Sequence, residues 1–323
     1  MRVNRMRGAI PFFLAFSAFV ASGFAASGID EDRLVRDKQG RAVEANFRLS
    51  WIADADLQAL ASMPYLTRLD FSHTRITDLG FLQLKGLKNV TDLNLYYAEQ
   101  IGDGALSAIQ NWKRLQHLNL RGTKVTDAGL AHLANLTSLE SLDIGYALIT
   151  DGGFEYLTSL PNLRTLSVGG NKVSDIGLNS LRLVPGLTSL DVSGAQRTDS
   201  GMWAASVTDQ GLDTIGMLTQ LRNLDLRGTK ISDAGFGKLS RLSELRSLDI
   251  GGTQLSAKGL SILPQLRKLE NVSLAKAPKI DDEAVGVLTQ APGLRWIDLH
   301  DTKVTDAGVA RLHAARPACQ ILR

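Results

Sequence analysis

The sequence predicts an α/β repeat solenoid, a horseshoe in which a concave parallel sheet of about ten to twelve short strands is backed by convex helices. Three observations support this prediction. A unit of about 24 residues recurs ten times, each unit holds a short alternating segment typical of a half-buried strand, and each continues into apolar residues at helical spacing. Stacked copies of such a unit share a continuous core that one unit cannot bury alone.

The repeats align on their first leucine-type position. Successive repeats are 24 or 25 residues apart, except that the unit beginning at Leu187 is 34 residues long. The predicted solenoid therefore covers residues 42–323 and carries an insertion at about residues 197–206, because extra residues in a repeat array map to loops on one face. The repeats start at Leu66, Val90, Leu115, Leu139, Leu163, Leu187, Leu221, Leu245, Leu269 and Leu294.

Each repeat contains a predicted strand followed by a predicted helix. In the first full repeat, alternation places Leu69 and Phe71 inward and their polar neighbours outward. Further along a repeat, a pair such as Thr126-Asp127 offers either its hydroxyl or its carboxylate to cap the first free amides of a helix. Apolar residues at helical spacing follow, so we expect the return helix to pack behind the strand.

The repeated pattern L-x-x-L-x-L-x-x-T-x-V-T-D-A-G-L-x-x-L-x-x-L resembles the leucine-rich-repeat family over essentially all of residues 42–323. It is most similar to the I-T-D-x-G-L subclass of F-box-type and many bacterial repeat proteins. Where that subclass often has cysteine, this chain has threonine or alanine, at Thr74, Thr123, Thr229, Thr253, Thr302, Ala98, Ala147, Ala195 and Ala277. The resemblance implies a leucine-rich-repeat solenoid, with substrate recognition for an F-box ubiquitin ligase as one alternative function.

The N-terminus has the layout of a signal peptide at residues 1–25. Arg2, Arg5 and Arg7 precede the uncharged apolar run Ala9–Ala21, and small residues favour cleavage after Ala25. This run is shorter than the roughly 20 residues of a membrane-spanning helix. We therefore expect an exported protein, periplasmic or extracellular, with tethering by an uncleaved leader as the alternative. Export also argues against the ligase alternative, as does the short segment before the first repeat, which has no room for a helical F-box.

Charge and cysteine content exclude several function classes. Without the three leader arginines, the 36 basic residues fall to 33, which equals the number of acidic residues. The chain is then formally neutral, so nucleic-acid binding is not predicted. Cys319 is the single cysteine, which excludes an internal disulfide and a multi-cysteine zinc site. No metal, cofactor or catalytic signature is predicted, and Cys319 is interpreted as a small buried residue.

Both ends of a solenoid need covers, because terminal repeats otherwise expose the shared core. Residues 26–41 are predicted to form an N-terminal cap or linker, with a turn signal at residues 37–40 between two strand-like segments. At the other end, residues 319–322 are interpreted as a last strand-like segment.

The outward columns of the strands contain the candidate binding residues. The middle column is a polar ladder with six aspartates, which we interpret mainly as support for neighbouring strand groups, with a site for a cation or basic ligand as the alternative. Exposed tyrosine and arginine are enriched at binding hot spots, so an early patch is the main candidate. This patch comprises His73, Tyr96, Tyr97, His117, Arg121 and Tyr146; a secondary candidate comprises Arg227, Trp296, His300 and Asp301.

Two further features need an interpretation. The insertion contains Met202 and Trp203, which either anchor a partner or fold back over a gap, and it resembles a partial copy of the helix-start motif. Asp92, His117 and Ser141 occupy one column on successive strands, as an activated serine requires. The sequence offers no oxyanion hole for them, and Ser141 lies within a regular strand, so hydrolysis is not predicted.

The sequence therefore predicts a noncatalytic exported scaffold that binds a macromolecule through its concave face. A protein partner is expected, with a glycan as the alternative ligand. A structural role in an envelope or at a cell surface is the further alternative, and the oligomeric state stays open.

Overall fold

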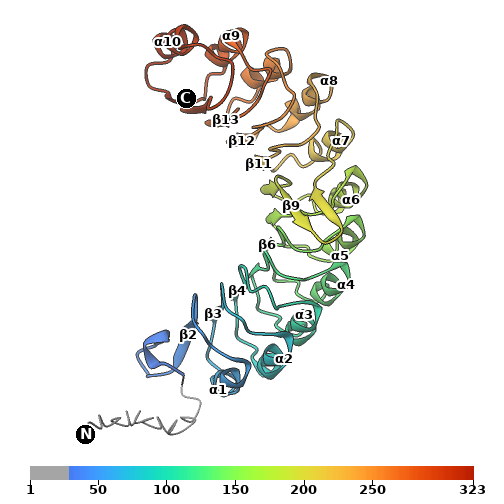
Figure 1. Cartoon of the computed structure of the whole chain (residues 1–323), viewed down its shortest axis with the longest axis vertical. Coiled ribbons are helices and arrows are strands. Elements are labelled where there is room, and N and C mark those ends of the chain that lie inside the picture. Colours follow the sequence, from blue (N-terminus) through green and yellow to red (C-terminus); the bar gives the residue numbers. More distant parts are fainter. Residues whose placement is uncertain (1–28) are drawn as a thin grey trace, which may run out of the picture.

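The computed structural model describes residues 29–323, and these form the predicted curved solenoid (Figure 1). The strands line the inner side of the curve and the helices the outer side. The expected leader at residues 1–25 lies outside the described residues. Among residues 29–323, no helix is long and apolar enough to cross a bilayer.

Thirteen strands form one sheet, in which they lie side by side in the order of the chain. The β9–β10 hairpin is not part of this sheet. Thirteen is one strand more than the upper predicted number, because the cap contributes β1, which pairs antiparallel with β2. All later pairs are parallel and in register. The strands are β1 Leu34–Arg36, β2 Ala42–Asn46, β3 Arg68–Asp70, β4 Asp92–Asn94, β5 His117–Asn119, β6 Ser141–Asp143, β7 Thr165–Ser167, β8 Ser189–Asp191, β11 Asn223–Asp225, β12 Ser247–Asp249, β13 Asn271–Ser273, β14 Trp296–Asp298 and β15 Gln320–Leu322.

The convex helices are short, and many begin as α-helix and end as 3-10 helix. The α-helices are α1 Leu57–Ala61, α2 Asp78–Phe81, α3 Asp103–Ile109, α4 Asp127–Leu130, α5 Phe154–Leu157, α6 Asp175–Asn179, α7 Gly211–Ile215, α8 Asp233–Phe236, α9 Asp282–Gln290 and α10 Asp306–Ala315. The 3-10 helices are Glu31–Arg33, Asp54–Asp56, Leu82–Gly86, Ala131–Leu133, Asp151–Gly153, Ser180–Leu183, Gly237–Arg241 and Gly259–Gln265.

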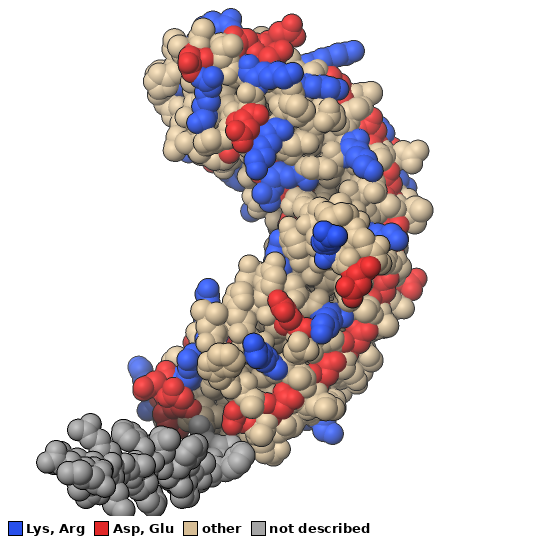
Figure 2. Space-filling view, in the orientation of Figure 1, with Lys and Arg blue, Asp and Glu red and all other residues tan. Residues whose placement is uncertain are grey.

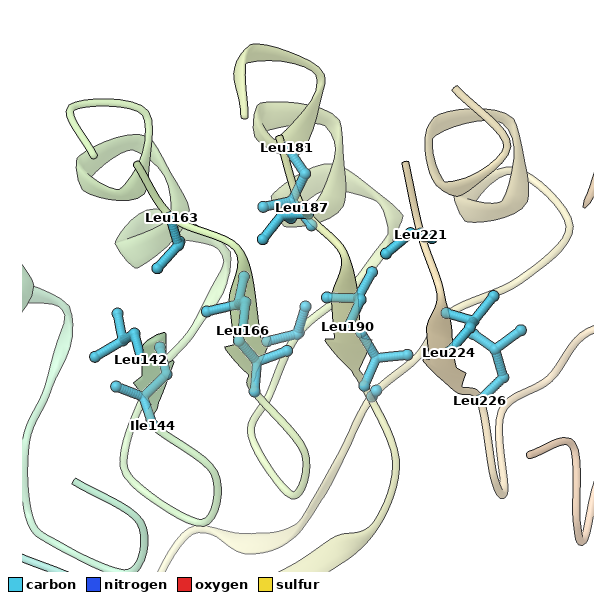
Figure 3. Close-up of a cluster of buried hydrophobic side chains, with 14 of the residues drawn as sticks. Leu142, Ile144, Leu163, Leu166, Leu181, Leu187, Leu190, Leu221, Leu224 and Leu226 are labelled. Carbon is cyan, nitrogen blue, oxygen red and sulfur yellow. The ribbon is translucent and has the colours of Figure 1, made fainter. Parts of the chain in front are cut away.

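Columns of leucine connect neighbouring repeats into one core (Figure 3). Leu142, Leu166, Leu190 and Leu224 occupy equivalent places on β6, β7, β8 and β11, and each is nearly or fully buried. The core continues to Cys319, which is 5% exposed and whose pKa is raised by burial. This confirms the interpretation of Cys319 as a buried residue.

The T-D-x-G motif links each repeat to the next through hydrogen bonds. The Thr126 hydroxyl accepts from the Ala128 amide and so caps α4, as predicted. The neighbouring Asp127 carboxylate accepts instead from the amide and hydroxyl of Thr150 in the next repeat, at 2.8 and 2.5 Å. The hydroxyl therefore caps its own helix and the carboxylate binds the following repeat.

The glycine of the motif makes room for this carboxylate. A Cβ added to Gly153 would lie 2.6 Å from Asp127 Oδ1, closer than such atoms approach each other. An aspartate link joins eight successive pairs of repeats and then one more. At Asp78 the partner has no hydroxyl, and the carboxylate accepts from the amides of Gly102 and Gly104. We call this series of contacts the aspartate ladder. Figure 2 shows acidic side chains recurring along the helical side of the molecule.

The aspartate ladder is interrupted once, and three positions differ together there. Ala257 stands where the aspartate is expected, Asp281 where the next hydroxyl is expected, and Ala284 where the glycine is expected. Asp281 accepts from the Glu283 amide of its own helix α9. Without an incoming carboxylate, the glycine is no longer needed, which explains why alanine fits at position 284.

We predict that the aspartate and the glycine are energetically coupled. Asp127→Ala removes two hydrogen bonds to a carboxylate and should lower the free energy of unfolding by about 2–3 kcal/mol. Gly153→Ala should lower it by about 1–3 kcal/mol through crowding against that carboxylate. Urea unfolding followed by circular dichroism should show the double variant to be less destabilised than the sum of the two single variants.

Gly237→Ala is the matched control, because nothing lies within 4 Å of the added Cβ. It should change stability little. Strict additivity of Asp127→Ala and Gly153→Ala would contradict the proposed coupling.

Candidate functional site

A turn with positive φ follows most of the concave strands, and its occupant differs between repeats. Glycine takes this conformation freely, whereas a bulky residue there costs roughly 1–3 kcal/mol. Large side chains nevertheless occupy most of the early turns. The occupants are Leu49, His73, Tyr97, Gly122, Tyr146, Gly170, Gly194, Gly228, Gly252, Lys276 and Asp301.

Three side chains of the predicted patch form an aromatic cluster at the ends of β3 and β4. His73 stacks on Tyr97 with ring centroids 5.7 Å apart, and it meets Tyr96 edge-on at 5.2 Å. Tyr96 and Tyr97 are in edge contact at 4.7 Å. Partial burial raises the pKa of Tyr97 above its usual value, so this phenol stays neutral at physiological pH. His73 is exposed and the two tyrosines are half-buried, so the cluster offers a rigid surface for contact.

Arg121 and Tyr146 form a second contact two strands further along. The Arg121 guanidinium lies 4.5 Å from the centroid of the Tyr146 ring, an arrangement suited to a cation–π interaction. The same guanidinium lies 3.5 Å from Asp143 Oδ1 and 3.9 Å from Asp191 Oδ2. Arg121 therefore links the turn edge to the concave face.

His117 is separate from the aromatic cluster. It lies on β5 and lines a shallow pocket of about 520 Å³ on the concave face, together with Asp92 and Ser141. Its Nδ1 is 2.9 Å from Asp92 Oδ1, so the first contact of the triad-like column is formed. Within residues 29–323, no hydrogen bond joins His117 to Ser141. The structure thus divides the predicted patch into a turn-edge part and a concave part.

The polar ladder serves the fold. On β6 the Asp143 carboxylate accepts from the Gly145 amide at 2.8 Å, and Asp70, Asn94, Asn119, Asp191, Asp225, Asp249 and Asp298 likewise accept from the amide two residues ahead. Aspartate and asparagine fill this role equally, so the ladder supports the turns after the strands. Burial raises the pKa of Asp143 and of Asp249, even though arginines lie nearby.

The structure does not bring the secondary candidate residues into one cluster. Arg227 follows β11 and pairs with Asp225 and Asp249, at 2.6 and 3.4 Å. Trp296 is on β14, three strands further along the sheet. Beside it, His300 Nδ1 lies 2.6 Å from Asp298 Oδ1. Asp301 occupies the last positive-φ turn.

The insertion forms a β-hairpin, although its sequence resembles a helix start. β9 (Ala195–Thr198) pairs antiparallel with β10 (Gly201–Ala204). Cross-strand hydrogen bonds pair the backbone N–H and C=O groups of the hairpin. The chain rejoins the repeat pattern at Ser206, whose amide donates to Val173 O. Leu190 and Leu224 remain paired across the insertion, so the sheet register is unchanged.

The hairpin folds back along the turn edge toward earlier repeats (Figure 1). Gln196 Nε2 donates to Ala147 O at 2.6 Å, which fixes β9 against the turn that holds Tyr146. Met202 is 69% exposed, whereas Trp203 is half-buried and its indole N–H donates to Ser200 Oγ at 2.8 Å. The sequence contained Trp203 as a signal, but nothing in it indicated that Trp203 would lie near Tyr97 and Tyr146.

Within residues 29–323, no group of three or more histidine, cysteine, aspartate or glutamate side chains is placed to hold a metal ion.

Comparisons with known proteins agree with this architecture. A family model described as a leucine-rich repeat matches residues 62–82, 115–134 and 159–181. The search of curated proteins finds no match. Among solved structures, the chain is similar to the crystal structure of an internalin from Listeria monocytogenes, with 26% sequence identity and a TM-score of 0.66. That similarity covers 85% of this chain and 72% of the internalin.

Fold and site together define an open repeat protein with an accessible concave face and turn edge. The repeated sequence, the family-model matches and the internalin similarity show that its fold is a leucine-rich-repeat solenoid.

We predict that Asp143→Asn changes the pH dependence of stability. A folded-state pKa above the ordinary value means that protonation of Asp143 stabilises the fold at low pH, and that this contribution is lost as pH rises through the raised pKa. Asparagine lacks this titration and keeps the cap on Gly145, as Asn119 does on Arg121. The melting temperature of the variant relative to wild type should therefore rise between about pH 3 and pH 7. A relative melting temperature that falls over this range would show that the Arg121 ion pair outweighs burial.

Proposed function

We propose that the chain is a noncatalytic, exported scaffold that binds a protein partner through the N-terminal half of its concave face and the adjoining turn edge. The observation that carries this proposal is the aromatic cluster. His73 and Tyr97 occupy turns where glycine would be unstrained, and their rings pack against each other at the surface. His73 keeps this backbone cost while its side chain stays exposed, so little burial offsets the cost, which is a sign of function.

The chemistry of this surface favours a protein partner. Tyrosine and arginine supply large contact areas with polar tips, and Arg121 joins such rings to a concave face lined by short polar side chains. The sheet of thirteen paired strands, parallel from β2 onward, supports these groups, which reduces the entropic cost of binding. Similarity to an internalin is consistent with a binding scaffold.

Catalysis has little support in the geometry of the concave pocket. Asp92 orients His117, but Ser141 lies in the middle of the sheet rather than on a strained turn, and both His117 and Asp92 are open to solvent. Export is proposed from the leader sequence at residues 1–25. If the chain has the alternative structural role, in an envelope or at a cell surface, the aromatic cluster binds no ligand.

We predict that His73→Gly weakens partner binding without a loss of stability. Proteins of the envelope fraction would be captured on the purified chain and identified, and the affinity of the recombinant partner would then be measured by surface plasmon resonance. His73→Gly and Tyr96→Ala should each weaken binding by about tenfold or more, because both remove part of a stacked contact surface. Glycine relieves the positive φ at position 73, so the melting temperature should not fall.

Lys276→Gly is the matched control, since Lys276 occupies the same turn with φ of 61° near the other end of the solenoid. It should leave affinity unchanged. Equal affinities for wild type, His73→Gly and Tyr96→Ala would refute the proposed contact surface and favour the structural role.

A further inference from the structure

The β9–β10 hairpin and the turn edge enclose a second cavity, which we call the hairpin groove. It has a volume of about 1040 Å³ and runs between the hairpin and the repeats that carry Tyr97 and Tyr146. His73, Tyr96 and Arg121 do not line it, so the hairpin groove borders the contact surface proposed above and shares only Tyr97 of the aromatic cluster with it. Its size is at the upper end for sites that hold small ligands or short polymer segments.

Aromatic rings stand on both sides of the hairpin groove. On the turn edge, the Tyr97 ring lies against Gly122, where an added Cβ would be 2.8 Å from the ring. The Tyr146 ring lies against Gly170 in the same way, with 2.9 Å to an added Cβ. Trp203 faces them from β10, and its indole N–H is held by Ser200. Each ring is half-buried and supported. His73 already stacks on Tyr97, and the Arg121 guanidinium already lies over the Tyr146 ring, so these two rings present to the groove the surface that those neighbours leave open.

Charged groups of both signs lie between these platforms. Glu99 and Asp199 bring two carboxylates, and Lys124 and Arg197 bring two cations, so the lining has no net charge. All four side chains are exposed, and in residues 29–323 none of them takes part in an ion pair. The hairpin groove therefore offers hydrogen-bond donors and acceptors side by side, next to aromatic surface.

This combination identifies the class of ligand. We propose that the hairpin groove binds a neutral oligosaccharide. Sugar rings have apolar C–H faces that stack on aromatic side chains, and their neighbouring hydroxyls both donate and accept, which matches a carboxylate beside a cation. A nucleic acid would require a net positive lining. A proline-rich peptide offers acceptors but few donors, and would leave Glu99 and Asp199 unpaired.

The hairpin groove is already formed in the structure. Four residue pairs hold β9 to β10, and Gln196 anchors β9 to Ala147 of the facing turn. Thr198 Oγ1 also donates to Gly201 O at 3.0 Å, which closes the hairpin turn. A preformed wall lowers the cost of ordering on binding, which favours the binding of a flexible, strongly hydrated ligand such as a sugar chain.

The test measures binding of cellohexaose, chitohexaose, maltohexaose and mannohexaose to the purified chain by isothermal titration calorimetry. At least one hexasaccharide should bind saturably. Trp203→Ala and Tyr146→Ala should each weaken that binding by about tenfold, as the loss of one stacking platform implies. Asp199→Asn should weaken it less, because the amide keeps one acceptor.

Met202→Ala is the matched control, because Met202 is the neighbour of Trp203 on β10 and does not line the hairpin groove. It should leave saccharide affinity unchanged. The proposal is overturned if none of the four saccharides binds, if Trp203→Ala and Tyr146→Ala bind like wild type, or if a proline decamer binds in their place. Each of these results is independent of whether a protein partner is found.

Discussion

The solenoid depends on one repeated interaction. The aspartate of one repeat accepts hydrogen bonds from the amide and the hydroxyl of a Thr or Ser in the next repeat. A strand and a short helix have few internal hydrogen bonds, and leucine columns by themselves do not fix how far one repeat turns against the next. Contacts such as that between Asp127 and Thr150 fix this placement at the start of most of the helices. At positions such as Gly153 the same carboxylate leaves no room for a Cβ, so one contact explains three of the four motif positions there.

The aspartate ladder leaves the turn edge free to vary. At the turns after the strands, Gly170 and Gly194 adopt positive φ without cost, while Tyr97 and Tyr146 adopt it at a cost that packing on glycine partly offsets. From Tyr97 to Gly170 the two kinds of occupant alternate, so that each tyrosine covers the glycine of the next turn. A recognition surface can thus be built on the turns while the core and the sheet register stay constant.

Much of the fold was predictable because its signals are local and periodic. Alternation located strands such as Arg68–Asp70, and the Thr126-Asp127 pair located a helix start. The partner of Asp127 was not predictable, since that contact joins residues 23 positions apart in different repeats. The candidate columns were correct in order, but the split between His117 and the aromatic cluster depends on where each side chain points. The position of Trp203 depends on a fold-back of the hairpin, for which the local sequence has no periodic signal.

The replacement of Asp by Ala257 divides the aspartate ladder into a long run and a short one. Strand pairing between β12 and β13 and the shared core continue across this point, but the carboxylate link is missing. Separate opening of the final repeats would therefore cost least at this boundary, where strand pairing and core packing act without the carboxylate. A joint here would let the curvature of the C-terminal arm adjust without disturbing the aromatic cluster at the opposite end.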